Sequence, residues 1–307
     1  MLKNQLFGVE VEMTGITRQK AADIIGEILG SHPSMPDGSC YHTRTILDSA
    51  SRKWKVMRDS SISPSRNDNG HDHTDEYRVE MVTPPLNYQD IDLLQKIVRK
   101  LKENGAKANS SCGIHVHVDG ANHNPDSLKR LVNLMIARQD LIYEALEIGS
   151  RENSWCKKLN ENLLKEMKKY KSLTKTAAEN IWYSSANDNY RYGIDHEHYN
   201  ETRYHGINLH SYFSKGTVEF RLFNSTLHAG KIKAYVQFCL AVSAWAITSK
   251  EKVVFHSMSD YTPSQKVTIM RNILTRRLGL YGDEFKTCRL HLMTPLKKTA
   301  GMTCRAA

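Results

Sequence analysis

Short stretches of alternating apolar and polar residues recur along the chain and predict β-strands. Three of these stretches place two chemically potent side chains two residues apart, namely Glu10-Val11-Glu12, His115-Val116-His117 and Glu219-Phe220-Arg221. Side chains i and i+2 share one face of a strand, so each pair projects to one side with Val or Phe on the other. We therefore expect a sheet with carboxylates, imidazoles and a guanidinium gathered on one face.

The same reading predicts strands at residues 6–13, 41–46, 54–57, 76–82, 112–119, 204–213 and 217–223. The last two are expected to form a tight hairpin, because Ser214-Lys215-Gly216 is typical of a three-residue turn. Periodic apolar positions predict helices at residues 18–29, 90–103, 125–147, 160–186, 231–248, 264–278 and 283–292. Polar segments 60–75 and 188–203 are predicted loops, and the pattern leaves open whether they close over a substrate.

A direct hairpin among mixed strands and helices excludes a purely parallel sheet. It predicts an α+β fold with a mostly antiparallel sheet that has helices on one face. No interdomain linker stands out. We expect one catalytic domain at residues 1–250, a helical extension of it at 251–293 and a disordered tail at 294–307.

The composition of the 307 residues is typical of a globular protein, with 40% hydrophobic and 25% charged residues. No apolar run is long enough to cross a bilayer, and the first residues show no signal-peptide pattern, so we expect a cytoplasmic protein with no membrane partner. Six scattered cysteines without a CxxC pair favour free thiols.

The net charge of +10 predicts a basic surface. Many basic residues lie in the predicted helical region 157–175 as a solvated face, and no nucleic-acid-binding motif is present. We therefore do not expect nucleic acid as the partner. The positive charge suits an anionic substrate instead, such as a nucleotide or an acidic peptide.

The carboxylate and imidazole pairs are candidates for a metal site. Glu10 and Glu12 on one strand face repel each other, and a hard divalent ion such as Mg²⁺ would offset that repulsion. The plain alternative is a solvated strand edge. His115 and His117 project the same way and suit a metal or phosphate. The alternative for them is two surface or partly buried histidines.

Glu219 and Arg221 could form an ordinary surface ion pair. In a site shielded from water, the two side chains would instead bind different ligands. The Glu219 carboxylate would bind a metal ion, and the forked Arg221 guanidinium would bind phosphate. Glu80 supplies a further carboxylate on its own strand. Asn208 and His210 share one face of the predicted strand 204–213 and are candidate donors to a substrate, or else ordinary hairpin polar residues.

These residues, in this order, resemble the amidoligase family of the glutamine synthetase-like carboxylate–amine ligases. The matching stretches run from residue 7 to about 248 and are Phe7-Gly8-Val9-Glu10-Val11-Glu12, Trp54-Lys55-Val56-Met57-Arg58-Asp59, Val79-Glu80-Met81-Val82-Thr83-Pro84, Cys112-Gly113-Ile114-His115-Val116-His117-Val118-Asp119, residues 204–209 and Gly216-Thr217-Val218-Glu219-Phe220-Arg221-Leu222-Phe223. The C-terminal helices look like those of family members from mobile elements.

The resemblance implies a glutamine synthetase-like fold, in which an antiparallel sheet curves around an ATP site with two or more Mg²⁺ ions. It implies that Glu10, His115 and Glu219 hold the ion that bridges the ATP phosphates. Glu12 and Glu80 would hold the ion nearer the acyl substrate.

The resemblance also implies catalytic roles. Arg221 would steady the transferred phosphoryl group, and His117 would lie near the nucleotide. We accordingly expect Arg221, Glu80 and His117 to be catalytic, and His117, Arg221 and Asn208 to contact the nucleotide.

The activity expected from this resemblance is an ATP- and Mg²⁺-dependent carboxylate–amine ligase. It would form an amide bond on an amino acid or peptide through an acyl-phosphate, so its partners would be a carboxylate and an amine. Two alternatives stay open. One is a guanidino kinase-like phosphotransferase, and the other is a non-catalytic nucleic-acid or partner-binding protein of a mobile element.

Overall fold

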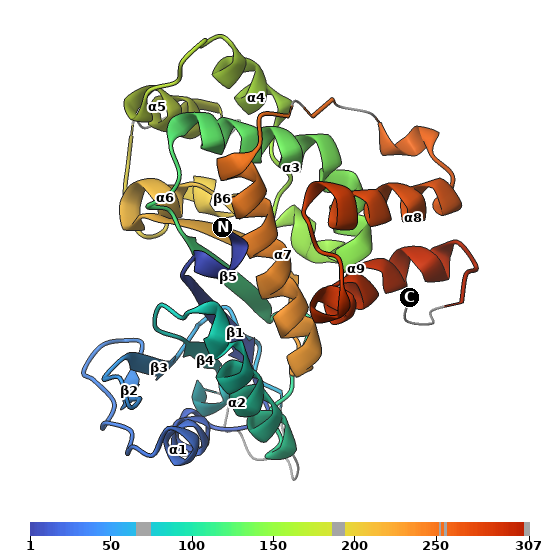
Figure 1. Cartoon of the computed structure of the whole chain (residues 1–307). Coiled ribbons are helices and arrows are strands. Elements are labelled where there is room, and N and C mark those ends of the chain that lie inside the picture. The colour runs from blue at the N-terminus through green and yellow to red at the C-terminus, as the bar shows by residue number, and fades with distance from the viewer. Residues whose placement is uncertain (66–74, 186–193, 252, 255–256, 304–307) are drawn as a thin grey trace. The chain divides into compact units, whose positions relative to one another are not determined.

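The structure is a computed structural model that describes residues 1–65, 75–185, 194–251, 253–254 and 257–303 (Figure 1). The chain divides into two compact units. The N-terminal unit comprises Leu6–Val116 and Phe223–Val236, and the C-terminal unit comprises Met1–Gln5, His117–Leu222 and Gln237–Ala307. Each unit is described by itself.

The sheet of the N-terminal unit is built from strands far apart in sequence. Its strand order is β2 (Arg44–Leu47), β3 (Lys53–Met57), β4 (Val79–Val82), β1 (Phe7–Met13) and then β5 (Gly113–Asp119), which leaves the unit after Val116. The pairs β2–β3, β3–β4 and β4–β1 are all antiparallel. The predicted alternation in these strands is therefore confirmed, with bounds shifted by a few residues.

One face of this sheet is apolar and is covered by a helix. Helix α1 (Arg18–Leu29) packs on β2, β3 and β4, and α2 (Ile91–Glu103) packs on α1 (Figure 1). The face under α1 carries Trp54, Val56 and Met81, all fully buried. Helix α1 begins where the Thr17 hydroxyl accepts a hydrogen bond from the Lys20 amide, an N-cap that the sequence predicts.

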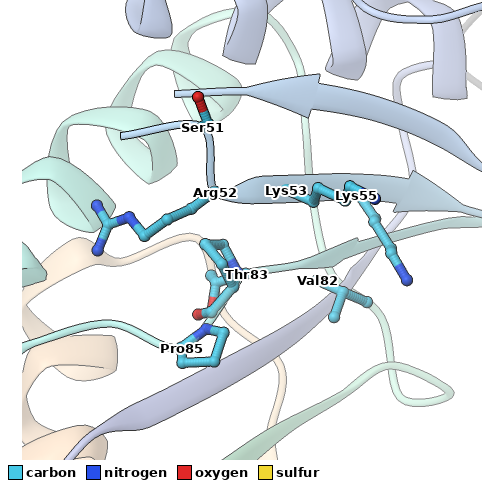
Figure 2. A pocket seen from close by; sticks show the side chains of 8 residues that line it. Ser51, Arg52, Lys53, Lys55, Val82, Thr83 and Pro85 are labelled. Carbon is cyan, nitrogen blue, oxygen red and sulfur yellow. The ribbon is translucent and has the colours of Figure 1, made fainter. Parts of the chain in front are cut away.

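The register decides which side chains share the other face. Directly opposed residues in antiparallel strands point to the same side. Glu12 lies opposite Glu80, which in turn lies opposite Met57. Lys55 lies opposite Val82, and Figure 2 shows these two side chains projecting from neighbouring strands to the same side. The polar face therefore runs from lysines on β3 to carboxylates on β4 and β1.

The strands of the C-terminal unit follow the order β5, β7 and β6, with β7 at Thr217–Asn224 and β6 at Ile207–Asn208. Strands β6 and β7 are antiparallel, and Asn208 lies opposite Glu219. Helix α7 (Ala229–Thr248) begins in the N-terminal unit and continues into the C-terminal unit. The other helices of the C-terminal unit in the described residues are α3 (Pro125–Leu146), α4 (Glu161–Lys168), α5 (Lys175–Ser185), α6 (His210–Lys215), α8 (Pro263–Asn272) and α9 (Lys286–Thr299). A π-helical turn, Ile273–Arg277, continues α8. Helix α9 packs on α3 and α8.

A buried polar chain links the N-terminus to α3 and α7 within the C-terminal unit. His123 Nε2 lies 2.9 Å from the Ser243 hydroxyl, which donates to the Gln5 side-chain oxygen. Gln5 donates in turn to the Leu240 carbonyl oxygen, and the Ser127 hydroxyl lies 3.0 Å from His123 Nδ1. The Ser127 hydroxyl itself donates to the Asn124 carbonyl oxygen at 2.7 Å. Burial and the nearby charge of Arg130 lower the pKa of His123 to about 4.

The two stretches predicted as a hairpin do pair as antiparallel strands, but the predicted tight turn at residues 214–216 and the strand up to residue 213 are wrong. Residues 210–215 form helix α6, and Gly216 ends it in the left-handed conformation with φ 82°. Because Asn208 pairs with Glu219, the ten residues 209–218 lie between these paired residues, and a short helix takes up most of that length. His210 therefore lies on α6 and not on a strand with Asn208.

Two helix predictions also change. The single helix expected at 160–186 is broken into α4 and α5, because the Thr174 hydroxyl caps a new start by accepting from the Ala177 amide. Residues 294–299, expected in a disordered tail, continue α9, where buried Leu296 extends the apolar face of the helix. Residues 66–74, 186–193 and 304–307 of the expected loops and tail lie outside the described residues.

Among the residues that the structure describes, no helix is both long and apolar enough to cross a lipid bilayer. The five cysteines within that part of the chain are free thiols. Mixed α/β architecture with antiparallel strand pairing is confirmed.

Candidate functional site

A cluster of three carboxylates and one imidazole lies on the polar sheet face of the N-terminal unit. We call it the carboxylate cluster, and its members are Glu10 and Glu12 of β1, Glu80 of β4 and His115 of β5. Alternation places each of these side chains opposite a buried Val, Ile or Met on the same strand. The local sequence thus selects the face, and the register of β1 with β4 brings Glu12 and Glu80 together.

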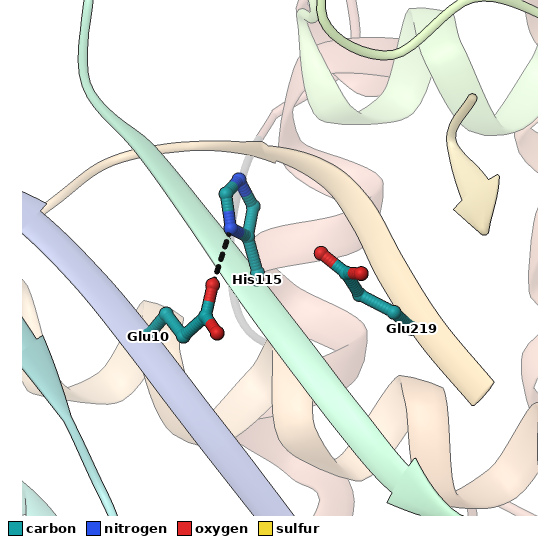
Figure 3. A group of neighbouring side chains, drawn as sticks. All are labelled: Glu10, His115 and Glu219. Atoms are coloured by element: carbon teal, nitrogen blue, oxygen red, sulfur yellow. Dashed lines mark hydrogen bonds and ion pairs between the residues drawn. The ribbon is translucent and has the colours of Figure 1, made fainter. Parts of the chain in front are cut away.

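His115 is held by its neighbours on β1. Its Nδ1 lies 2.8 Å from Glu10 Oε2, and Figure 3 shows the two side chains turned toward each other from their strands. Its Nε2 lies 3.7 Å from Glu12 Oε1. If Nδ1 donates its proton to Glu10, the lone pair of Nε2 faces Glu12, which is how a carboxylate orients a metal-binding imidazole. The second oxygen of Glu12 accepts a 2.6 Å hydrogen bond from the Gly113 amide.

The closely spaced carboxylates of this cluster are suited to binding a cation. Glu12, Glu80 and His115 are all buried, and each offers a ligand atom within 4.8 Å of the others. Two ligands on opposite sides of an ion at about 2.1 Å would lie about 4.2 Å apart. Small side-chain adjustments would therefore close the three groups around one ion, and the donor set of carboxylate oxygens with one imidazole fits a divalent cation. Two buried, opposed carboxylates without a cation repel each other.

A second cluster lies on the end of β5 and on β6 and β7 of the C-terminal unit. We call it the arginine cluster, and its members are His117, Asn208, Glu219 and Arg221. Arg221 Nη1 donates to Glu219 Oε1 at 2.7 Å, and the Asn208 side-chain amide donates to Glu219 Oε2 at 2.6 Å. Both charged side chains are only 5% exposed. The pair is therefore a buried one, and the alternative of a surface ion pair is wrong.

The guanidinium of Arg221 is fixed on further sides. Its Nε donates to the Trp155 carbonyl oxygen at 3.4 Å, and its Cζ atom lies 5.9 Å from the centre of the Tyr204 ring. The Arg221 backbone amide donates to the Gly206 carbonyl oxygen. A side chain at Gly206 would collide with the Tyr143 hydroxyl, so this close approach of β6 and α3 requires glycine. The fold thus presents a preoriented arginine beside a carboxylate.

His117 begins the part of β5 that belongs to the arginine cluster. Its Nδ1 lies 3.1 Å from the Thr217 hydroxyl, which contacts the Ser211 hydroxyl at 2.9 Å. Its Nε2 lies 3.9 Å from Glu219 Oε1. Thr217 and Ser211 were not predicted as site residues; β7 brings Thr217 beside His117 because it neighbours β5 in the sheet, and α6 brings Ser211 to Thr217.

The candidate residues of the sequence are therefore found in two groups. Glu10, Glu12, Glu80 and His115 come together in one unit, and His117, Asn208, Glu219 and Arg221 come together in the other. Sequence reasoning expected Glu219 and Arg221 to act on different ligands, whereas in this structure they bind each other. It also missed the Gly113 amide, because no side-chain pattern signals a backbone donor.

The chain matches the family described as "Putative amidoligase enzyme" over residues 3–243. The chain belongs to this family. No curated protein matches the sequence.

The amidoligase match covers every residue of both clusters, since the first is Glu10 and the last is Arg221. It ends within α7, so α8 and α9 follow the family region. Membership of this family implies an enzyme that forms an amide bond, which agrees with the expectation drawn from the motifs.

Proposed function

We propose that this amidoligase is an ATP- and Mg²⁺-dependent ligase that joins a carboxylate to an amine on an amino acid or peptide. A carboxylate is a poor acceptor for an amine, so its oxygen would first receive the γ-phosphoryl group of ATP. The amine would then attack the acyl-phosphate carbon, and inorganic phosphate would leave. The observation that carries the proposal is the buried Glu12–Glu80 pair beside His115, in a chain of the amidoligase family.

Each cluster has a distinct part in the proposal. Glu12, Glu80 and His115 would hold a divalent ion, and Glu10 would orient His115 and offer its second oxygen as a further ligand. A bound Mg²⁺ would neutralise phosphate oxygens and align the reacting groups. We assign Glu219 to a second ion on the strength of the resemblance.

Arg221, held by Glu219, would present its fork of donors to the phosphoryl group during transfer. His117 and Asn208 would lie at the nucleotide. We propose that both clusters serve the same reaction, as the family resemblance implies. A glutamine synthetase-like site architecture is part of this proposal.

The test is product analysis. The purified protein is incubated with ATP, MgCl₂ and a mixture of amino acids and acidic peptides, and products are identified by mass spectrometry. The proposal expects an amide product, with ADP released much faster when both a carboxylate and an amine are present. Glu80→Gln should abolish both, whereas Glu27→Gln, at an exposed position of α1, should change neither.

Other outcomes identify the alternatives. A phosphorylated amine with no amide would indicate a guanidino kinase-like phosphotransferase. Absence of any ATP turnover, together with nucleic-acid binding that falls steeply with salt, would indicate a binding protein. Turnover that survives Glu80→Gln unchanged would remove the metal assignment.

A further inference from the structure

A basic pocket lies on the polar face of the N-terminal unit, at the end of the strand β4 that carries Glu80. It has a volume of about 470 Å³ and is lined by Ser51, Arg52, Lys53, Lys55 and the segment 82–85 (Figure 2). A volume of this size suits part of a small-molecule substrate. The pocket lies between the ends of β3 and β4, and no residue of the carboxylate cluster lines it.

The charge of the pocket comes from two lysines. Lys53 and Lys55 are exposed, and within the described part of the chain neither has an ion-pair or hydrogen-bond partner through its ammonium group. Arg52 is already engaged, because its guanidinium binds Asp48 at 2.8 Å and Asp90 at 2.6 Å. Neither aspartate lines the pocket. The lysines therefore provide an uncompensated positive charge to whatever occupies it.

The register relates this charge to the carboxylate cluster. Lys55 lies opposite Val82, and Glu80 lies two residues from Val82 on the same face of β4. Lys55 and Glu80 are therefore diagonal neighbours, with backbones roughly 7–8 Å apart. A flexible lysine side chain spans part of that distance, so a small molecule could contact the Lys55 ammonium at one end and the Glu80 carboxylate's ion at the other.

The lining indicates which anion fits. Phosphate sites usually offer several backbone N–H groups or an arginine fork. Here Pro84 and Pro85 have no N–H, and the fork of Arg52 is taken by Asp90. The Thr83 hydroxyl accepts from the Val9 amide and donates to the Pro84 carbonyl oxygen. What is left is the Ser51 hydroxyl and two flexible ammonium groups, which can neutralise a carboxylate but lack the arginine fork that would hold a polyphosphate in two places.

We propose that this pocket binds a second carboxylate of the acyl substrate, through Lys53 and Lys55, while the carboxylate to be activated lies at Glu12 and Glu80. This inference rests on the proposed function and narrows it. The acyl substrate would be a dicarboxylate, such as an acidic amino acid or a peptide with a free C-terminal carboxylate beside the reacting group. The lysines would also attract this anion toward a face that is otherwise acidic.

The test measures binding with MgCl₂ present and without nucleotide, by ligand-observed NMR, because the reacting carboxylate needs the ion at Glu12 and Glu80. The probes are glutarate, which has two carboxylates, butyrate, which has one, and inorganic phosphate. Glutarate should bind the wild type more tightly than butyrate, and 0.5 M NaCl should weaken it. Each of Lys53→Gln and Lys55→Gln should cost about threefold in glutarate affinity and the double variant about tenfold. Lys96→Gln, at an exposed position of α2, is the matched control and should have no effect.

Three results would overturn the inference. They are equal binding of glutarate and butyrate by the wild type, unchanged glutarate affinity in the double variant, and a lysine-dependent site that prefers phosphate to glutarate. A wild type that does not bind glutarate at all would overturn the inference in the same way as equal binding of glutarate and butyrate. Because no ATP is present, these results are separate from the ligase test. Lysine-dependent glutarate binding in a protein that makes no amide would leave the pocket standing and the ligase proposal refuted.

Discussion

Replacing Glu80 by glutamine should stabilise the metal-free protein and weaken its response to Mg²⁺. The side chain lies opposite Glu12 on the neighbouring strand, and both are buried beside His115. Glutamine keeps the size and shape of glutamate and removes one negative charge. The variant therefore tests whether the cluster is built around a cation or is merely a set of polar residues.

The magnitude follows from the spacing of the ligand atoms. At 4.8 Å and an effective dielectric constant of about 20, two unit charges repel by about 3 kcal/mol. The hydrogen bond from the Gly113 amide offsets part of this, so we expect a gain of about 1–3 kcal/mol in the free energy of unfolding without metal. For a chain of this size that corresponds to a rise of a few degrees in the melting temperature.

Addition of Mg²⁺ should make the wild type more stable than Glu80→Gln, which is the reverse of their order without metal. An ion that binds only the folded protein stabilises it by about 2.7 kcal/mol at a concentration 100 times its dissociation constant. The wild type should gain this stabilisation and Glu80→Gln should not. Thermal melts in EDTA and across a MgCl₂ series measure both effects, and Glu27→Gln serves as the control.

Two results would refute the reasoning. A Glu80→Gln variant that melts below the wild type in EDTA would show that Glu80 contributes favourable contacts rather than repulsion. A variant stabilised by Mg²⁺ as much as the wild type would show that the ion binds elsewhere.

Three further predictions concern the C-terminal unit. The lowered pKa of His123 means that its neutral form stabilises the fold above pH 6.5, and that this contribution, about 3 kcal/mol, is lost as pH falls toward 4; urea unfolding between pH 7.5 and 4.5 should show this loss in the wild type and less of it in His123→Asn. Gly206→Ala should lower the free energy of unfolding by more than about 2 kcal/mol, because the new methyl group meets the Tyr143 hydroxyl and Leu222, and urea unfolding at pH 7.5 measures it. Arg221→Lys should keep the fold by circular dichroism but reduce ADP release at least about tenfold, since an ammonium group cannot reproduce the fork.

Each of these has a contrary outcome. A pH slope of the unfolding free energy that is identical in the wild type and His123→Asn would mean that the ring titrates normally in the folded state. A Gly206→Ala protein with wild-type stability would mean that α3 can move away from β6. Full activity in Arg221→Lys would reduce that residue to a point charge.

Much of the local structure could be predicted because it depends on local physics. Alternation places Glu10 with Glu12, and His115 with His117, on one face of a strand whatever the rest of the chain does. Helix starts at Thr17 and at Pro125 follow from their capping chemistry. The family motifs added their order along the chain, which the match over residues 3–243 confirms.

Local patterns failed where several structures were possible for the same residues. The stretch after Asn208 alternates like a strand, yet it forms α6, because the pairing with Glu219 leaves ten residues to connect. Helix 160–186 was expected to be continuous, because nothing in its periodicity shows that Thr174 starts a second helix. In both cases the choice depends on where neighbouring elements are held.

The sequence alone determined which side chains share a strand face, since that follows from covalent geometry and a period of two. It also determined that acids, imidazoles and a guanidinium are available to a common chemistry. Only the tertiary structure decided that Glu12 opposes Glu80, that Arg221 binds Glu219, and that Lys55 lies diagonal to Glu80. Register between strands is a long-range choice, so no short window of sequence contains both Glu12 and Glu80, and the local pair Glu219 and Arg221 is fixed as a buried ion pair only by the elements packed around it.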